Sequence, residues 1–442
     1  MSTLRDISVL TRIFTPRLPL YLSATAASLG IFILVRSFRS SALSYEEAAI
    51  IPSPRETLFS QLSQKEIENL PYPPDALPGA RDVDTPYGSI RVYEWGPEDG
   101  RKVLLIHGIS TPSIALGPLA HKLVEKGCRV MMFDLFGRGY TSTPSPHTYP
   151  HSSQLFTTQI HLVLSSSLLP WTTSSFTLLG YSLGGGLAAD FTSYFPRLVS
   201  HLILIAPGGL IRESHITWKS RLLYSTSGFI PERVIEWLVG RRLYSGPSSA
   251  DVKGTTMESV GQDGDAPDSH IQKIGGLRTQ AVYLSPALAL LPGRANSTVS
   301  AVVDWQVAHH PGFVPAFISS IRYAPIHGQQ KRWKVIGERL ERQWRVRTFS
   351  SSRLSLSTTY TEEAKEEAER EGLERNKVLI VLGEKDPIII AEEVGSDARA
   401  ALGFKHVDVR VVKGVGHEVP IERAEEVADI IQWHWEGNDA QI

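Results

Sequence analysis

The residues that decide the fold are 176–184, which read Phe-Thr-Leu-Leu-Gly-Tyr-Ser-Leu-Gly. A short apolar run typical of a buried strand enters a G-x-S-x-G pattern centred on Ser182, and a helical pattern follows. The turn from strand to helix in this pattern is so tight that its serine takes a strained backbone conformation, for which Gly180 and Gly184 leave room. The pattern therefore predicts a nucleophilic serine at the N-terminus of a helix, where developing negative charge is favoured.

Apolar runs on both sides of this turn predict a mostly parallel sheet. They lie at residues 103–106, 130–133, 202–205, 378–382 and 407–412, and a hairpin with its second strand at 89–95 precedes them. Because strands and helical patterns alternate, we expect an α/β fold with helices on both faces of the sheet. About 170 residues separate the runs at 202–205 and 378–382, far more than an ordinary connection. This excess predicts an inserted helical cap at about residues 208–375.

Three further motifs make the sequence resemble the α/β-hydrolase superfamily. Ile-His-Gly-Ile at 106–109 follows one strand, and Asp-Leu-Phe-Gly-Arg-Gly-Tyr-Thr-Ser at 134–142 follows the next. The third is a pair of loops, Gly-Glu-Lys-Asp-Pro at 383–387 and Gly-Val-Gly-His at 414–417. Within the superfamily the sequence is similar to capped serine esterases, monoacylglycerol lipases and meta-cleavage-product hydrolases. The resemblance covers residues 81–442, is weakest in the cap, and implies an α/β-hydrolase fold.

Asp386 and His417 complete the expected catalytic triad with the serine of the turn. Both follow strands, at the sheet edge where open α/β folds bind ligands, and the chain order Ser, Asp, His is the one this fold uses. A histidine can take the serine proton near neutral pH, and an aspartate fixes its tautomer. Glu384 is an alternative candidate for the acid, and His406 and His434 are alternative candidates for the base. The match of Gly-Glu-Lys-Asp-Pro to the family favours Asp386, and only His417 lies on the expected loop.

The resemblance also implies an oxyanion hole and a substrate pocket. The expected oxyanion donors are the backbone N–H groups of Ile109 and Leu183, with the side chain of His107 supporting the loop. The expected pocket residues are Tyr181, Phe313 and Phe317. The two phenylalanines are four positions apart in the cap, so an alternative is that they simply pack the cap helix onto the core.

The N-terminal segment predicts a membrane anchor. Residues 18–35 carry no charge and are flanked by arginines on both sides; as a helix they would cover about 27 Å, close to the thickness of a hydrocarbon core. We therefore expect a tail at 1–17, a single-pass transmembrane helix at 18–35 and a proline-rich linker at 36–80, with the endoplasmic reticulum favoured. A cleaved secretory signal and a mitochondrial presequence are the alternatives.

The composition excludes several classes of function. The formal net charge is -1, from 45 basic and 46 acidic side chains, and gives no sign of a nucleic-acid partner. Cys128 is the only cysteine, so neither a disulfide within the chain nor a multi-cysteine zinc site can form. The adjacent His309 and His310 lack a third ligand at a useful spacing, so we expect no metal and no cofactor.

These observations predict a serine hydrolase that cleaves a carboxylic ester, with lipid esters among the candidates because of the expected anchor. Its expected partners are a small-molecule or lipid ester substrate and the membrane. The serine at position 182 argues against epoxide hydrolases and dehalogenases, which use an aspartate there. Other serine members of the fold are thioesterases, acyltransferases or carbon–carbon hydrolases, and some bind ligands without catalysis, so these alternatives stay open.

Overall fold

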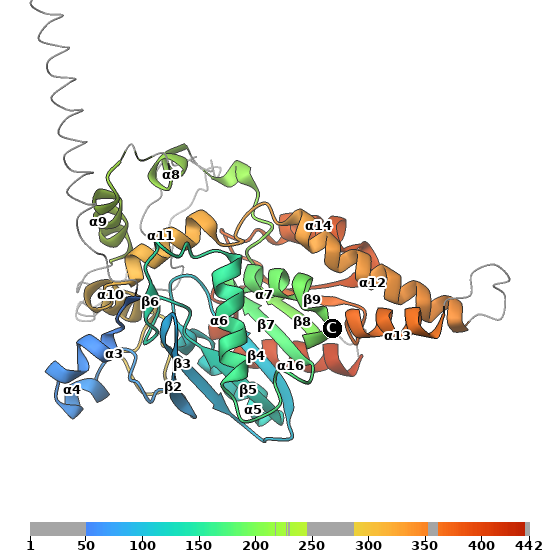
Figure 1. Ribbon diagram of the computed structural model, residues 1–442, viewed down its shortest axis with the longest axis horizontal. Helices are drawn as coiled ribbons and strands as arrows, with labels where there is room; N and C mark the ends of the chain where they lie inside the picture. Colours follow the sequence, from blue (N-terminus) through green and yellow to red (C-terminus); the bar gives the residue numbers. More distant parts are fainter. Residues whose placement is uncertain are drawn as a thin grey trace, which may run out of the picture. The chain divides into compact units, whose positions relative to one another are not determined.

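An eight-stranded sheet organises the described part of the chain (Figure 1). The computed structural model describes residues 50–244 apart from 217, 227 and 229, residues 287–351, and residues 361–437. The strands are β2 (Ala80–Thr85), β3 (Gly88–Trp95), β4 (Arg101–Ile106), β5 (Cys128–Phe133), β7 (Phe176–Tyr181), β8 (Val199–Ile205), β9 (Val378–Gly383) and β10 (Val407–Val412). Their order is β10-β9-β8-β7-β4-β5-β3-β2. The pairs β2–β3 and β3–β5 are antiparallel, and the other neighbouring strands are parallel. The mostly parallel sheet is confirmed.

The central strands are apolar because the sheet is covered on both faces. Every residue of β7, β8 and β9 is buried, and in register Leu104 lies between Met131 on one side and Leu178 on the other. Each predicted apolar run falls within one of these strands. A continuous run without alternation is what a parallel strand buried on both faces requires.

Helices form a layer on each face of the sheet (Figure 1). One layer holds α5 (Gly117–Glu125) and α16 (Ala424–Glu436), which pack against each other. In the other layer, contacts run from α6 (Ser153–Ser165) through α7 (Leu183–Tyr194) and α12 (Gln330–Ser351) to α14 (Ala391–Leu402). Short elements complete the unit: β1 (Ile50–Ile51), α3 (Pro54–Thr57), α4 (Gln64–Glu68), β6 (Thr143–Pro144) and α15 (Val419–Glu422).

The segment between β8 and β9 is helical where it is described. It contains α8 (Trp218–Leu223), α9 (Glu232–Leu243), α10 (Val299–His309), α11 (Phe313–Tyr323), α12 and α13 (Glu362–Glu371). Helices α9, α10 and α11 contact one another, whereas α12 packs on α7 and α14 beside the sheet. Within the expected cap at 208–375, α12 therefore joins the helix layer of α7 and α14, whereas α9, α10 and α11 form a group of their own.

Residues 50–79, expected to belong to an irregular linker, pack onto the sheet instead. They belong to the same compact unit, Ala49–Ile442, as the strands. Tyr72 and Leu77 are buried, and the Tyr72 hydroxyl donates to the Tyr93 hydroxyl at 2.7 Å. Prolines prevent long helices here, but they do not prevent the chain from burying single aromatic side chains.

The prediction of a transmembrane helix is wrong for the structure as described. Across residues 50–437, leaving aside the gaps named above, no helix is both long and apolar enough to cross a bilayer. The longest, α12 with 22 residues, carries Lys, Arg and Glu along its whole length. The expected span at 18–35 lies outside the described residues, as does the tail at 1–17. The predictions of a single-pass membrane protein, a membrane location and a membrane partner are therefore not supported by the structure.

Candidate active site

Ser182 occupies a strained turn between β7 and α7. Its backbone has φ 54° and ψ −118°, a conformation that residues other than glycine rarely adopt. A Cβ atom at Gly180 would lie 2.1 Å from the carbonyl oxygen of Gly184, and one at Gly184 would lie 2.1 Å from that of Ile106. Both glycines are thus required by close backbone contacts, and the turn lifts Ser182 above the end of the sheet, where it is half-buried.

Three predicted residues form one hydrogen-bonded chain. The Ser182 Oγ atom lies 3.0 Å from His417 Nε2, and His417 Nδ1 lies 2.7 Å from Asp386 Oδ2. Ser182 follows β7, Asp386 follows β9 and His417 follows β10, so parallel strands bring together residues that are 235 and 31 positions apart. With Nδ1–H donating to the carboxylate, Nε2 is the acceptor for the serine hydroxyl.

The environment of His417 favours its protonated form. Burial alone would lower the pKa of His417, but the hydrogen bond and charge of Asp386 and the charge of Glu418 outweigh burial and raise that pKa above its ordinary value. The Asp386 carboxylate is itself held from its other side, because its Oδ1 accepts the N–H groups of Ile388 and Ile389 at 2.8 and 2.9 Å. This arrangement stabilises an imidazolium when His417 takes a proton.

The loop after β4 lies against Ser182. A Cβ atom at Gly108 would lie 3.3 Å from Ser182 Cβ. Within the described part of the chain, the N–H groups of Ile109 and Leu183 donate to no protein acceptor. Leu183 is the first residue of α7, where such unpaired donors are normal. Two free donors beside a serine hydroxyl are suited to hold a developing negative charge.

The side chain of His107 supports this loop. Its Nδ1 atom lies 2.7 Å from the carbonyl oxygen of Gly108, and its Nε2 accepts the N–H of Leu135 at 2.9 Å. Burial lowers the pKa of His107 to about 3, so the ring is neutral at physiological pH. The carbonyl of Gly108 and the N–H of Ile109 belong to the same peptide group, and His107 therefore fixes the orientation of that N–H.

Comparison with known proteins identifies the family of the chain. Residues 103–430 match the model of the alpha/beta hydrolase family. The chain belongs to this family. A human serine hydrolase-like protein is 32% identical over 143 residues, which are 31% of this chain and 68% of that protein. An uncharacterized protein of Mycobacterium tuberculosis is 30% identical over 145 residues, which span 33% of this chain and only 40% of that protein.

Solved structures show the same fold at low sequence identity. The protein lip1 of Acinetobacter baumannii AYE superposes with a TM-score of 0.50 and 16% identity, covering 83% of this chain and 94% of that one. At this identity the likeness supports the fold alone. The expected α/β-hydrolase fold is thus confirmed by the family model and by the sheet.

The expected pocket residues of this alpha/beta hydrolase occupy two different environments. The ring of Tyr181 lies 5.4 Å from that of His417, so Tyr181 borders the hydrogen-bonded chain. Phe313 and Phe317 lie on α11 with ring centroids 6.3 Å apart, and both are buried in the hydrophobic core. The position of the two phenylalanines fits the packing alternative at least as well as a pocket role.

The rival acidic and basic residues lie elsewhere. Glu384 accepts the backbone N–H of Gly414 at 2.8 Å and so braces the loop that leads to the catalytic histidine candidate. His406 Nε2 lies 3.2 Å from Glu341 Oε2, and the rings of His434 and His201 meet edge to face. In the ranges that the structure describes, no three His, Cys, Asp or Glu side chains are grouped to hold a metal ion.

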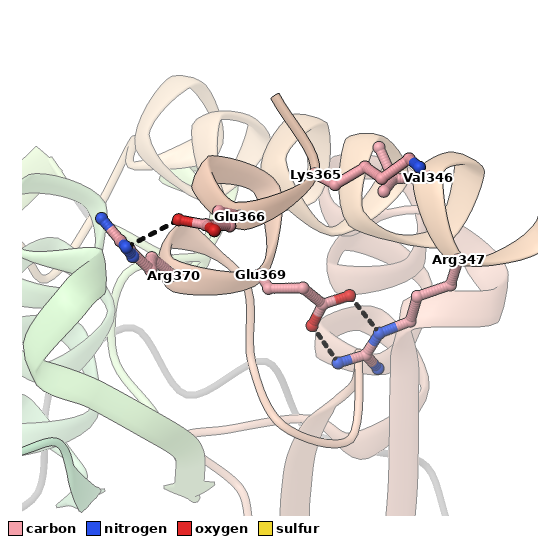
Figure 2. A pocket seen from close by; sticks show the side chains of 6 residues that line it. All are labelled: Val346, Arg347, Lys365, Glu366, Glu369 and Arg370. Atoms are coloured by element: carbon pink, nitrogen blue, oxygen red, sulfur yellow. Dashed lines mark hydrogen bonds and ion pairs between the residues drawn. The ribbon is translucent and has the colours of Figure 1, made fainter. Parts of the chain in front are cut away.

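A surface hollow of about 470 Å³ lies between α12 and α13 (Figure 2). Its charged side chains are all paired: Arg347 Nε lies 2.7 Å from Glu369, Arg370 lies 2.9 Å from Glu366, and Lys365 lies 2.6 Å from the neighbouring Glu362. None of the predicted site residues lines it. Such self-paired charges leave little for a ligand to bind, so the hollow does not compete with the Ser182 site.

Sequence reasoning missed three residues that support the site. As a motif of the family, residues 134–142 gave no role to single side chains, but Asp134 and Arg138 of this motif are fully buried and hydrogen-bond to the loop at 107–113. Gln306 of α10 reaches the same loop. The partners of Gln306 lie 196 and 167 residues away, so no local pattern could have pointed to this residue.

Proposed function

We propose that the protein hydrolyses carboxylic esters through an acyl-serine intermediate. Ser182 is the nucleophile, His417 the general base and acid, and Asp386 the residue that orients the imidazole. The backbone N–H groups of Ile109 and Leu183 bind the oxyanion. Small-molecule esters are the expected substrates, and no cofactor takes part in the reaction.

One observation supports this proposal above the others. It is the row of hydrogen bonds from Asp386 Oδ2 to His417 Nδ1 at 2.7 Å and from His417 Nε2 to Ser182 Oγ at 3.0 Å. The row ends on a serine whose backbone φ is 54°. A serine hydroxyl that merely stabilises a turn needs neither a buried, carboxylate-bound histidine nor a strained backbone.

The reaction follows from this geometry in two halves. Ser182 Oγ attacks the ester carbonyl while its proton passes to His417 Nε2, and the negative charge develops on the carbonyl oxygen beside the two free N–H groups. When the carbon–oxygen bond breaks, His417 gives the proton to the leaving alkoxide, and an alcohol departs. Water then attacks the acyl-serine with the same base, which releases the carboxylic acid and restores Ser182.

The test is a panel of p-nitrophenyl esters with acyl chains from two to sixteen carbons, combined with intact-protein mass spectrometry. We expect turnover of at least one ester and, at short reaction times, a mass increase equal to one acyl group on Ser182. Turnover that survives Ser182→Ala would contradict the proposal, as would an acyl group on another residue. Thioesters, amides and acyl acceptors other than water belong in the same panel, because they share the acyl-serine step.

A further inference from the structure

Arg138 is a buried cation whose only acceptors are neutral. Its side chain is fully buried; Nε donates to the Ile109 carbonyl at 3.0 Å, Nη1 to the Phe136 carbonyl at 2.8 Å, and Nη2 to Ser320 Oγ at 2.9 Å. Among the described residues, no carboxylate lies within ion-pair distance of the guanidinium. A buried charge normally has an opposite charge beside it, because removing a charge from water is unfavourable.

The buried guanidinium of Arg138 affects the electrostatics of its surroundings. Burial lowers the pKa of Arg138 to about 9, so the group still carries its charge at neutral pH. This charge also contributes, after burial, to lowering the pKa of His107, His151 and His310. The field of Arg138 therefore reaches His107, which holds the peptide of the proposed oxyanion donor.

One acceptor of Arg138, the carbonyl of Ile109, belongs to the loop of the proposed oxyanion hole. Ile109 gives its N–H to the proposed oxyanion hole and its carbonyl to Arg138. Movement of that carbonyl would turn the backbone of the residue whose N–H must point at the substrate. Fixed donors around an oxyanion contribute to the rate because they need no reorganisation as charge develops.

We propose that Arg138 is a positioning residue for the oxyanion hole, holding the carbonyl of Ile109 and placing a positive charge next to the residue whose N–H binds the oxyanion. This inference rests on the proposed function. The positive charge stabilises the tetrahedral intermediate, whose oxygen is negative, more than it stabilises the neutral ester. Arg138 therefore acts on the rate of the chemical step and leaves substrate affinity nearly unchanged.

The same network extends to the cap helices. Gln306 of α10 accepts the N–H of Gly139 at 2.9 Å and donates to the carbonyl of Ser110 at 2.9 Å. Ser320 of α11 accepts from Arg138 and donates to the Ala316 carbonyl at 2.7 Å. The oxyanion loop and the loop that carries Arg138 are thus both tied to helices of the insertion.

The experiment compares Arg138→Met, Arg138→Gln and Arg138→Lys with the wild type. For each variant we would measure kcat and KM on the best ester of the panel, the Kd of an alkylboronic acid that mimics the tetrahedral intermediate, and the melting temperature. We expect Arg138→Met and Arg138→Gln to lower kcat about 10- to 100-fold, somewhat less than loss of a direct oxyanion donor. KM should stay within about three-fold, and boronate affinity should fall in parallel with kcat, because only interactions made in the transition state are lost.

The lysine and serine variants separate charge from packing. Arg138→Lys keeps the charge and should recover most of the lost kcat, whereas Arg138→Gln is uncharged. Ser320→Ala removes one acceptor of the guanidinium but leaves the charge, so its kcat should stay within about three-fold of wild type. If Arg138→Met does not fold, the ratio of kcat for Arg138→Lys to kcat for Arg138→Gln decides whether the charge of Arg138 contributes to the rate.

Two outcomes would overturn the inference. One is folded Arg138→Gln with wild-type kcat and boronate affinity, which would make Arg138 a purely structural residue. The other is a raised KM at unchanged kcat, which would make Arg138 part of a substrate-binding site. Either result would leave the proposed function intact, since that function is tested separately by ester turnover and acylation of the wild-type protein and by the loss of turnover in Ser182→Ala.

Discussion

His417 Nδ1 lies 2.7 Å from Asp386 Oδ2, and the other oxygen of this carboxylate is held by the N–H groups of Ile388 and Ile389. The carboxylate side chain is completely shielded from solvent. Because both oxygens of Asp386 accept hydrogen bonds from groups of the protein, the carboxylate is held in one orientation. It therefore fixes the imidazole so that Nε2 points at Ser182, 3.0 Å away.

The raised pKa of His417 predicts the pH dependence of activity. The neutral imidazole is the base, so activity is absent when His417 is protonated and rises as pH increases through the pKa of that group. Because Asp386 and Glu418 raise the pKa of His417, the midpoint of the kcat/KM profile should lie above the ordinary value of about 6.5. The measurement is kcat/KM on a p-nitrophenyl ester from pH 5 to 9. A midpoint below 6 would contradict the assigned environment.

Replacing Asp386 with Asn should reduce kcat by about 10⁴-fold, because an amide in this position favours the wrong histidine tautomer. The variant also loses the charge that raises the pKa of His417 and retains the burial that lowers it. The midpoint of the pH profile of its residual activity should therefore lie at a lower pH than in the wild type. Glu384→Gln is the matched control, since Glu384 is exposed and contacts only the loop. A loss below ten-fold in Asp386→Asn would show that another acid serves His417.

Alanine at Gly180 should destabilise the fold and abolish activity together. The added Cβ would lie 2.1 Å from a backbone oxygen, so the turn that carries Ser182 must move. We expect a loss of about 2 kcal/mol or more in the free energy of unfolding, measured by urea denaturation.

Gly395→Ala serves as the control for this substitution. Its new Cβ would approach no atom closer than 3.4 Å, and its position within α14 favours alanine by about 0.5–1 kcal/mol. Equal unfolding free energies for the two variants would be inconsistent with the described turn.

Asp134 should be important for stability and not for chemistry. Its buried carboxylate accepts the N–H groups of Ser113 and Tyr140 at 2.9 and 3.0 Å and lies 3.2 Å from the Tyr72 hydroxyl. Asp134→Ala leaves the N–H groups of Ser113 and Tyr140 without their acceptor, which should cost about 3 kcal/mol or more of unfolding free energy.

The control for Asp134 is an exposed acid. Asp429→Ala breaks a surface ion pair with Lys126 and should change stability by less than about 1 kcal/mol. Thermal and urea denaturation of both variants would test this contrast. A loss below 1 kcal/mol in Asp134→Ala would mean that water replaces the carboxylate without difficulty.

The sheet could be predicted from the sequence because local patterns specify it. Each apolar run became a strand, and the parallel order follows from the helices that alternate with the strands. The residues that approach Ser182 were also predictable. They lie in short motifs directly after strands, and the parallel sheet brings the ends of those strands to one edge.

The supporting network could not be predicted, because its contacts join distant segments. Arg138 meets Ser320 across 182 residues, and Tyr72, in a stretch expected as linker, meets Asp134 across 62. Neither pair leaves a periodic or spacing signal. The membrane prediction failed for a different reason: it rested on the uncharged run at residues 18–35 and the arginines on both sides of it, without any packing information.

The most direct test of the central claim is labelling with a fluorophosphonate probe, with wild-type protein and Ser182→Ala compared at equal concentration. An activated serine attacks the phosphorus and keeps the probe, whereas an ordinary serine hydroxyl does not. We predict labelling of the wild type on the peptide that contains Ser182, and none of the folded Ser182→Ala protein. Equal labelling of both proteins, or no labelling of folded wild type, would contradict the assignment of Ser182 as the nucleophile.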